Sequence, residues 1–307
     1  MITQIDQLYQ PLAEPVADIA ADFGIQVIAA AHYLDFRKGD KVVRISVRHF
    51  VYGEDIARSF DYYHDAVKPV DVGGVSLVDY STPRYHDVVG FDLMPVFFAS
   101  FAEPVKTTTQ YLDFARLVAG ASVIDLGAYA GLTSIIFKQQ VGESGRVVAV
   151  DADRQNVVAI ERNLALFERM TGDRVDFKHA AIWNHTDGLS FSSEGNMGSA
   201  VSGMMTGDRG VTDEVPSATL SSLVEEFGLE RVDFIKCDVE GAELKVFEDE
   251  AFFERFKPRI IVESHEVDGG GTTTGKFSAD LERHGYTCRV IDQHGVVLPL
   301  VECHPPQ

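Results

Sequence analysis

The sequence lacks the features of a disulfide-bonded, metal-ribbon or membrane-spanning protein. It has only three cysteines, Cys237, Cys288 and Cys303, and none of them forms a Cys-x-x-Cys pair, so neither a zinc ribbon nor a dithiol redox motif is expected. No run approaches the ~20 apolar residues that cross a bilayer. Residues 1–10 show no basic and then apolar stretch of a secretory signal. We therefore expect a cytoplasmic protein with free thiols.

Basic residues are scarce. Lys and Arg number 27 against 47 Asp and Glu, which gives a net charge of -20. Such a chain repels phosphate backbones and anionic lipid surfaces, so we expect neither a nucleic-acid partner nor a membrane partner. The acidity is explained by solubility or, alternatively, by an acidic site for a cationic ligand or a metal. With 307 residues, 45% of them hydrophobic, the chain is long enough for about two domains.

The N-terminal third reads as an α+β cap that spans residues 1–105. Its expected elements are a helix over 1–24, strands over 25–36 and 41–49, a helix over 53–66 and an irregular strand-like part over 70–104. The second domain, residues 106–307, begins with an expected helix over 107–119. We expect the cap to serve substrate binding or pairing.

From residue 122 the pattern alternates between short apolar runs and helical segments. The runs are Ser122–Leu126, Val147–Val150, Val175–His179, Phe234–Cys237 and Ile260–Glu263. The helices fit at about 131–141, 155–170, 219–227 and 242–254. This alternation predicts a doubly wound α/β fold with a mostly parallel, buried sheet. Ligands of such sheets bind at the carboxyl ends of the strands.

The loop after the first run carries two glycines, Gly127 and Gly131, four residues apart. A glycine at 127 permits a tight turn and a close backbone approach, but the Gly-x-Gly-x-x-Gly fingerprint of dinucleotide sites is missing. S-adenosylmethionine has no pyrophosphate, and its cationic sulfonium and amino group suit a carboxylate such as Asp125. A generic strand–turn–helix connection is the alternative interpretation.

Residues after the second and third runs extend the predicted cofactor site. Asp151 lies 24 residues beyond Gly127 (151 − 127), where a carboxylate can accept bonds from a ribose diol. The alternative is a helix N-cap, for which Asp153 is better placed. Small residues around Ala181 and Ile182 leave room for a flat ring, and Trp183 either borders that ring or belongs to the core.

With these residues in place, the chain resembles the FkbM-type methyltransferase family. Three segments carry the resemblance: Val123–Ala128 with Gly131 and Thr133, Asp233–Glu243, and Arg259–His265. The second contains Lys-x-Asp-x-Glu-Gly-Ala-Glu, which is close to a family signature. The resemblance covers roughly residues 100–265. The chain has Thr219–Leu220–Ser221 where the family often has Thr-Leu-Asp, and Ser221 is expected to cap the following helix.

The resemblance implies a class I methyltransferase fold (Rossmann-like) with S-adenosyl-L-methionine as donor. It usually implies O-methylation, on a small-molecule hydroxyl of a sugar, a glycan or a secondary metabolite such as a macrolide. A nicotinamide-dependent oxidoreductase and a non-catalytic binding module of this fold remain alternatives, and a homodimer is a further expectation. The expected donor contacts are Glu103, Asp125, Gly127, Ala128, Tyr129, Gly131, Thr133, Asp151, Ala152, Ala181, Ile182 and Asp238.

Three side chains after the fourth and fifth runs are candidates for catalysis, namely Asp238, Glu240 and His265. His265 is the favoured general base because histidine titrates near neutral pH. A hydrogen-bonded loop histidine and a charged first helical turn, with Glu240 and Glu243, are the structural alternatives. Together with Glu263 these groups could also hold a magnesium-like ion. No spacing demands one, so we expect no metal and activity that survives chelation.

Two glycine-rich segments, Ser192–Gly210 and Asp268–Gly275, are expected to shape the acceptor pocket. They follow strand ends, where they could close as a lid that excludes water. Plain surface linkers are the alternative.

Overall fold

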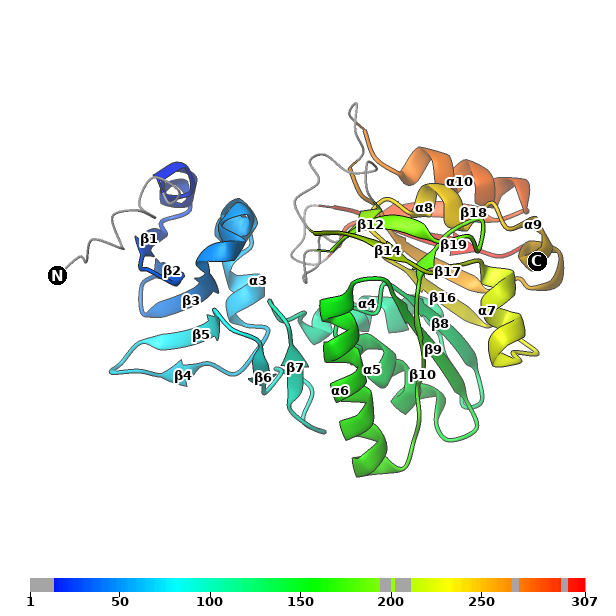
Figure 1. Cartoon of the computed structure of the whole chain (residues 1–307), viewed down its shortest axis with the longest axis horizontal. Coiled ribbons are helices and arrows are strands. Elements are labelled where there is room, and N and C mark those ends of the chain that lie inside the picture. Colours follow the sequence, from blue (N-terminus) through cyan, green and yellow to red (C-terminus); the bar gives the residue numbers. More distant parts are fainter. Residues whose placement is uncertain (1–13, 194–199, 202–210, 267–270, 294–297, 307) are drawn as a thin grey trace. The chain divides into compact units, whose positions relative to one another are not determined.

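The computed structural model describes residues 14–193, 200–201, 211–266, 271–293 and 298–306. The chain forms two compact units, Met1–Val105 and Lys106–Gln307 (Figure 1). Each unit has its own sheets, and each is described by itself.

The first unit contains a five-stranded sheet with the strand order β1-β2-β3-β5-β4. Its strands are β1 (Gln26–Ala29), β2 (Tyr33–Lys38), β3 (Lys41–Ser46), β4 (Val70–Asp71) and β5 (Ser76–Tyr80). A small hairpin follows, made of β6 (Arg84–His86) and β7 (Val96–Phe98). The helical elements are η1 (Val47–Tyr52), α2 (Gly53–Arg58), α3 (Phe60–His64) and a helix whose described part covers residues 14–22.

Two elements expected in this unit are each divided in the structure. The expected strand over 25–36 is the antiparallel pair β1 and β2, with Ala29 opposite Leu34. The expected helix over 53–66 breaks at Ser59, whose backbone leaves the helical region at φ -117° and ψ 35°. Both errors arise because a turn between two apolar segments leaves little trace in hydrophobic periodicity.

The second unit is built on a seven-stranded sheet with the order β10-β9-β8-β16-β17-β19-β18. The strands are β8 (Ser122–Leu126), β9 (Arg146–Asp151), β10 (Asp176–His179), β16 (Phe234–Cys237), β17 (Arg259–Glu263), β18 (Thr287–Ile291) and β19 (Leu300–His304). All pairs from β10 to β17 are parallel, and β19 is antiparallel to both neighbours. This confirms the predicted class I methyltransferase fold, with its switch in strand order between β8 and β16.

Helices cover both faces of this sheet (Figure 1). They are α4 (Val105–Ala115), α5 (Leu132–Val141), α6 (Arg154–Thr171), α7 (Leu220–Phe227), α8 (Glu243–Val246), α9 (Glu250–Arg255) and α10 (Thr274–Arg283). Phe234 packs against Phe114 of α4 and Phe137 of α5. The next residue, Ile235, belongs to the core cluster that contains Phe277 of α10. Because neighbouring strand residues alternate between faces, the sheet carries two cores, which explains its continuous apolar strands.

Short strands also connect the main elements beyond β10. They are β11 (Ala181–Ile182), β12 (Leu189–Ser193), β13 (Ala200–Val201), β14 (Val211–Val215) and β15 (Ser217–Ala218). β11 pairs in parallel with β15, and β12 pairs with both β13 and β14. None of these strands, nor β18 and β19, was predicted, because each is short or partly polar.

Helix capping confirms one prediction and corrects another. Asp153 is the N-cap of α6 and accepts bonds from the backbone of Gln155 and Asn156, as predicted. Ser221 does not cap α7. The cap is Thr219, which forms a capping box with Ser222, and Ser221 bonds Asp249 instead. Asp249 in turn caps α9, at the point where the expected helix over 242–254 is interrupted.

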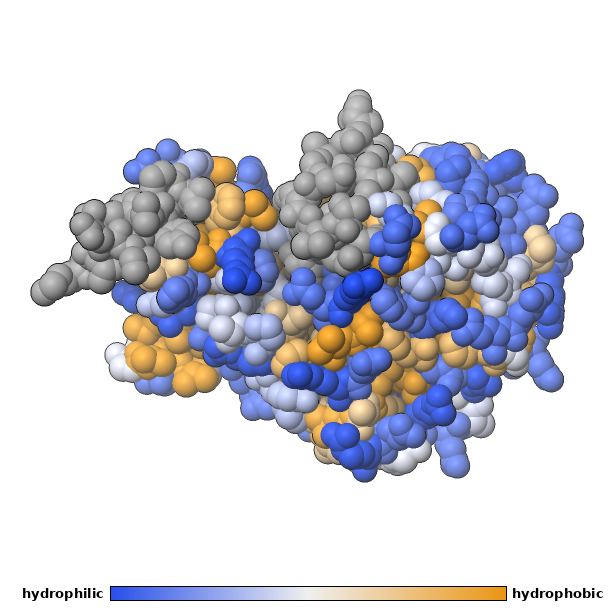
Figure 2. Space-filling view, viewed as in Figure 1, coloured by the Kyte–Doolittle hydropathy of each residue, from blue (hydrophilic) through white to orange (hydrophobic). Residues whose placement is uncertain are grey.

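The surface shows one apolar feature in the first unit. Val70 and Val72 in the β4–β5 hairpin are 64% and 55% exposed, and apolar residues gather there in Figure 2. Among the described helices, none has both the length and the apolar character needed to cross a membrane.

Candidate active site

The tips of β8 and β16 meet at Gly127. Its φ is +75°, and a Cβ built on it would lie 1.7 Å from the carbonyl oxygen of Asp238. Gly127 thus allows a close approach to the loop after β16, while its approach to a ligand remains a prediction. Gly131 (φ +78°) has only ordinary contacts, with Ile160 and Leu164, so its glycine serves the left-handed turn that opens α5.

Asp125 lies behind this loop and has no exposed surface. Its Oδ2 accepts a 2.5 Å bond from Ser134 Oγ, and its Oδ1 is 3.5 Å from Lys236 Nζ. Burial raises the pKa of Asp125, although Lys236 and Ser134 act in the opposite direction. In this structure Asp125 contacts Lys236 and Ser134 of α5, and its direct contact with a donor remains a prediction.

Asp151 stands at the end of β9 and is 8% exposed. One oxygen accepts from Tyr129 N at 2.8 Å, and the other accepts from Asp153 N at 2.9 Å. Burial raises the pKa of Asp151 to about 7, against these two backbone bonds. Asn156 Nδ2 donates a third, longer bond to Asp151 Oδ1 at 3.4 Å. A carboxylate has about four acceptor positions, so one remains for a ribose hydroxyl, and a second hydroxyl could replace the long bond from Asn156. Next to it, no described group bonds the buried Oδ1 of Asn156. These polar groups fit a nucleoside.

The other predicted donor contacts divide into two sets. Those in the second unit follow β8, β9 or β10 in the chain and are buried: Ala128, Tyr129, Thr133, Ala152, Ala181 and Ile182. Thr133 is turned inward, with its hydroxyl 2.8 Å from that of Thr108. Glu103 belongs to the first unit, so its contact with a donor remains a prediction.

Lys236 lies between the donor residues and the catalytic candidates, and the sequence interpretation missed it. Its Nζ donates to the carbonyl of Gly127 at 2.5 Å and lies 3.4 Å from Asp238 Oδ2. The side chain is buried in β16. A lysine within the apolar run Phe234–Cys237 was the available signal, because lysine is almost never buried without a partner.

Asp238 and Glu240 are the accessible carboxylates of the loop after β16, with side chains 24% and 20% exposed. Burial acts to raise the pKa of Asp238, but Lys236 and His265 outweigh it and hold the pKa at about 2. Burial raises the pKa of Glu240 to about 8, against the attraction of His265. Glu240 also has a left-handed backbone, with φ 49°, so the loop is held in a strained conformation.

Glu243 holds this loop in place. It has no exposed surface, and its carboxylate accepts from Val239 N at 3.0 Å and from Gly241 N at 2.9 Å. The same carboxylate lies 3.1 Å from His265 Nδ1. Glu243 was interpreted from the sequence as part of a charged first turn of a helix, and it is the acidic residue in the first turn of α8. The structure shows in addition that it closes the loop and contacts the histidine.

His265 is 2% exposed and faces three carboxylates. Its Nε2 lies 3.4 Å from Asp238 Oδ1 and 3.5 Å from Glu240 Oε1. Burial acts to lower the pKa of His265, but Glu240, Glu243 and Asp238 raise it well above the usual value. Nε2 thus faces Asp238 and Glu240, and almost none of the ring is exposed. His265 is therefore at the predicted place, in a setting that favours orientation over proton abstraction.

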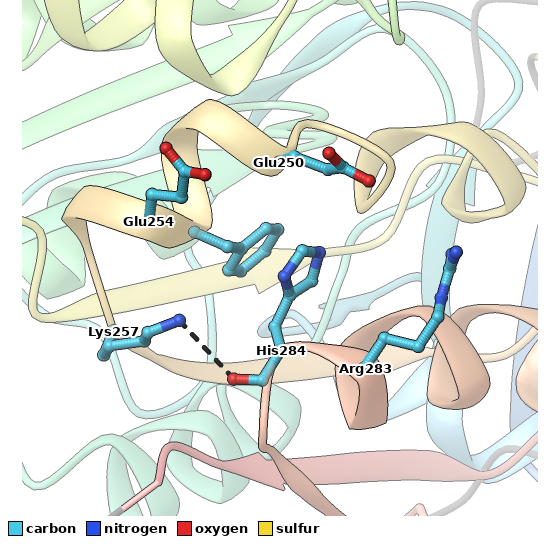
Figure 3. A pocket seen from close by; sticks show the side chains of 6 residues that line it. Glu250, Glu254, Lys257, Arg283 and His284 are labelled. Carbon is cyan, nitrogen blue, oxygen red and sulfur yellow. Dashed lines mark hydrogen bonds between the residues drawn. The ribbon is translucent and has the colours of Figure 1, made fainter.

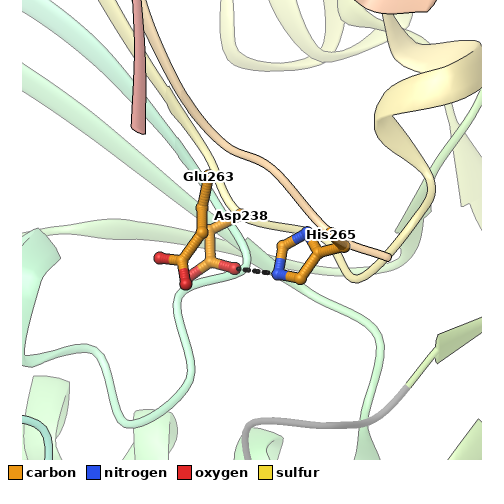
Figure 4. A group of neighbouring side chains, drawn as sticks. All are labelled: Asp238, Glu263 and His265. Carbon is orange, nitrogen blue, oxygen red and sulfur yellow. Dashed lines mark ion pairs between the residues drawn. The ribbon is translucent and has the colours of Figure 1, made fainter. Parts of the chain in front are cut away.

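Glu263, at the end of β17, completes the group (Figure 4). In Figure 4 its carboxylate and that of Asp238 lie side by side, and Asp238 faces the His265 ring. Gln293 Nε2 donates to Glu263 Oε2 at 3.0 Å. Burial and the charge of Asp238 raise the pKa of Glu263 to about 8. Gln293 had not been singled out from the sequence.

Most of the first predicted lid segment and residues 268–270 of the second lie outside the described residues, which omit 194–199, 202–210 and 267–270. The described end of the second segment is packed. Thr273 is fully buried, its N–H donates to the carbonyl of His265 at 2.8 Å, and its hydroxyl accepts from His265 N at 3.1 Å. Residues 271–275 thus fix His265 and begin α10.

A separate pocket lies at the opposite edge of the sheet (Figure 3). Glu250, Phe253, Glu254, Lys257, Arg283 and His284 line it. Lys257 precedes the first residue of β17, so this pocket is at the amino ends of the strands. His284 stacks on Phe253, with ring centroids 4.6 Å apart. The charges are mixed, and the pocket has no carboxylates from the strand tips.

Comparisons with known proteins identify a family and several similar proteins. Residues 125–288 match the family model described as the methyltransferase FkbM domain. The chain is 26% identical over 193 residues to the methyltransferase sdnD of Sordaria araneosa, over 53% of this chain and 73% of that protein.

Solved structures with a similar fold include methyltransferase FkbM from Methylobacillus flagellatus. It is 13% identical with a TM-score of 0.42, over 96% of this chain and 57% of that one. Precorrin-6y C5,15-methyltransferase from Geobacter metallireducens is 17% identical with a TM-score of 0.40, over 64% of this chain and 84% of that one. Because the family model matches more than half of its residues, this chain belongs to the FkbM methyltransferase family, whose general reaction is S-adenosylmethionine-dependent methyl transfer.

Proposed function

We propose that this protein is an O-methyltransferase that transfers the methyl group of S-adenosylmethionine to a hydroxyl of a sugar, a glycan or a secondary metabolite. One observation carries the proposal. The partly exposed carboxylates of Asp238 and Glu240 stand at the carboxyl end of β16, next to the Gly127 loop. This is the edge of the sheet where ligands of such folds bind.

The chain's own residues supply binding and alignment. We infer that Asp151 accepts a bond from a ribose hydroxyl. The loop after Gly127 supports this inference, because it contacts Asp151 through Tyr129 N and the Asp238 backbone through Gly127. When bound, S-adenosylmethionine supplies a methyl group already activated by the sulfonium. Holding an acceptor oxygen close to that carbon and in line with it can contribute as much as ~7–11 kcal/mol.

A hydroxyl acceptor must also lose its proton. We place that proton on Glu240, because this side chain is accessible and Asp238 is already paired with Lys236. Since the pKa of Glu240 is raised to about 8, the fraction of Glu240 that can act as this base increases as the pH rises through 8. His265 is enclosed and bonded to Glu243, so it orients the carboxylates. A positioned base contributes about 10²–10⁴-fold to such a reaction.

The partner is proposed to be a small molecule, with no nucleic acid and no membrane, since the net charge of -20 repels anionic surfaces. A cytoplasmic location and a homodimer remain predictions. For the dimer, the exposed valines of the β4–β5 hairpin are the place to introduce charge and measure the oligomeric state.

The test is transfer from labelled S-adenosylmethionine to a panel of monosaccharides, glycosides and macrolide alcohols, with primary amines as the competing class. We expect label on hydroxyls. Glu240→Gln should lower the rate by about 10²-fold and leave donor affinity, measured by calorimetry, nearly unchanged. The exposed Glu230→Gln variant is the matched control.

Two results would contradict the proposal. Label that goes to amines alone would make this chain an N-methyltransferase. The carboxylates of the site would then serve to attract a cationic acceptor. Tight donor binding without transfer to any acceptor would instead favour a non-catalytic binding module.

A further inference from the structure

Three possible metal ligands converge at the tips of β16 and β17. Asp238, Glu263 and His265 each offer one ligand atom, and these atoms all lie within 4.8 Å of one another. Opposite ligands of an octahedral ion with bonds of about 2.1 Å are about 4.2 Å apart, so small side-chain rotations would suffice to close the group on an ion.

The orientation of His265 matches that of a metal ligand. Metal-binding histidines usually donate their second ring N–H to a carboxylate, and His265 Nδ1 lies 3.1 Å from the fully buried Glu243. With Nδ1 donating to Glu243, Nε2 is the ring atom that faces Asp238 and Glu240, and a bound ion would take the place of the proton on Nε2.

The Nε2 distances also fit an ion better than direct pairing. Nε2 is 3.4 Å from Asp238 Oδ1 and 3.5 Å from Glu240 Oε1. Charge-assisted hydrogen bonds are shorter, at about 2.7–2.9 Å. Neighbouring ligands around an ion with bonds of about 2.1 Å are separated by about 3.0–3.4 Å.

Gln293 gives a second, independent indication. The residue is 7% exposed, and its Nε2 donates to Glu263 Oε2 at 3.0 Å. Among the described residues, no donor bonds its buried Oε1. A buried amide oxygen without a donor is costly, and this one belongs to an amide group whose nitrogen contacts a candidate ligand. Rotation of the amide group would bring this oxygen toward an ion held by Glu263.

We propose that Asp238, Glu263, His265 and the Gln293 amide oxygen form a site for one hard divalent cation, Mg²⁺ or Mn²⁺. Three oxygen ligands with one imidazole suit Mn²⁺ and, with added waters, Mg²⁺. The open positions would be left for water or for the acceptor hydroxyl. This replaces the expectation of no metal that the sequence alone supports.

The catalytic role of the ion rests on the proposed function. The acceptor hydroxyl would bind the cation, which lowers the pKa of a bound O–H group. Its proton passes to the Glu240 carboxylate. The oxygen then forms a bond to the methyl carbon as the carbon–sulfur bond breaks, and the electron pair of that bond stays on sulfur. The products are the methyl ether and S-adenosylhomocysteine.

The experiment measures Mn²⁺ binding to the full chain, without donor or acceptor, by loss of the free-ion electron paramagnetic resonance signal. We expect each chain to bind one Mn²⁺ ion, and we expect Mg²⁺ to displace that ion. Asp238→Asn, Glu263→Gln and Gln293→Leu should each weaken binding about tenfold or more, while Glu230→Gln should not. Circular dichroism spectra of each variant, compared with the parent, check that it is folded.

The absence of Mn²⁺ binding at millimolar concentration would overturn the site, and so would binding that the folded ligand variants leave unchanged. Binding at the site without any methyl transfer to a hydroxyl would leave the site in place and count against the proposed function. In an active enzyme, chelation should abolish transfer and added Mg²⁺ or Mn²⁺ should restore it. Activity that survives complete chelation would remove the catalytic role.

Discussion

The carboxylates at the carboxyl ends of β8 and β9 differ in burial and in bonding partners from those at the ends of β16 and β17. In the half of this sheet edge at β8 and β9, Asp151 is buried and its bonds come from neutral groups, chiefly the backbone of Tyr129 and Asp153. In the half at β16 and β17, Asp238 and Glu240 are partly exposed and face the ionisable groups Lys236 and His265. Neutral hydrogen-bond donors hold a carboxylate in one orientation, which suits the binding of a ligand. Ionisable partners can take up or release a proton, which suits the chemical step.

This difference assigns binding to the first half and chemistry to the second. The halves are not independent, because Gly127 and Lys236 join them. Gly127 allows the β8 loop to lie against the Asp238 backbone, and Lys236 contacts both Asp125 and Asp238. Changes at these two residues should therefore damage both halves, while a change at Asp151 should affect only one.

The largest effect is expected from Gly127→Ala. The added Cβ would meet the Asp238 carbonyl oxygen at 1.7 Å, and backbone cannot move away cheaply, so unfolding free energy should fall by more than about 4 kcal/mol. Gly172→Ala is the matched control, since Gly172 has nearly the same φ, +79°, with nothing within 4 Å. It should cost about 1–2 kcal/mol. Urea unfolding of both variants tests the comparison. Equal losses of unfolding free energy would show that Gly127 is not needed for close packing of the β8 loop against the Asp238 backbone.

Lys236→Met should have the next largest effect. It leaves the fully buried Asp125 and the nearby Asp238 without their shared cation. Removing one member of a buried ion pair costs about 3–5 kcal/mol, and we expect the lower end because Asp125 can take up a proton. Lys245→Met, which removes a lysine with a 38% exposed side chain paired with Glu248, should cost under about 1 kcal/mol. Similar urea midpoints for the two variants would show that Lys236 does not link the halves.

Much of the second unit was predictable from the sequence. The five predicted apolar runs match β8, β9, β10, β16 and β17 within one residue at either end, because buried parallel strands are continuously apolar. The Asp153 cap was also predictable, since capping depends on a few adjacent residues. Both are signals that local sequence carries.

The remainder depended on contacts distant in sequence. Glu243 reaches His265 across 22 residues, and Gln293 reaches Glu263 across 30. Neither contact has a local pattern. Likewise, the burial of Asp125 follows from Lys236 on the neighbouring strand. Sequence placed candidate residues at the correct edge of the sheet, but only their partners distinguish a buried positioning group from an accessible catalytic one.

The smallest effect, about tenfold in affinity, concerns Asp151 alone. Its pKa of about 7 lies above the ordinary value because of burial, so it is ionised above pH 7 and protonated below. An ionised carboxylate accepts stronger bonds from ribose hydroxyls. Donor affinity should therefore be full at pH 8 and decrease as the pH falls through 7. It should be about tenfold weaker at pH 6 if only the ionised form binds.

Calorimetry with S-adenosylmethionine at pH 6, 7 and 8 measures this dependence. Asp151→Asn should bind more weakly at pH 8 and lose the part of the pH dependence that belongs to the carboxylate. A pH profile identical in Asp151→Asn and the parent chain would place the titrating group elsewhere. If that profile then disappeared in Glu240→Gln, the buried half would no longer be the binding half, and the division between binding and chemistry along this sheet edge would fail.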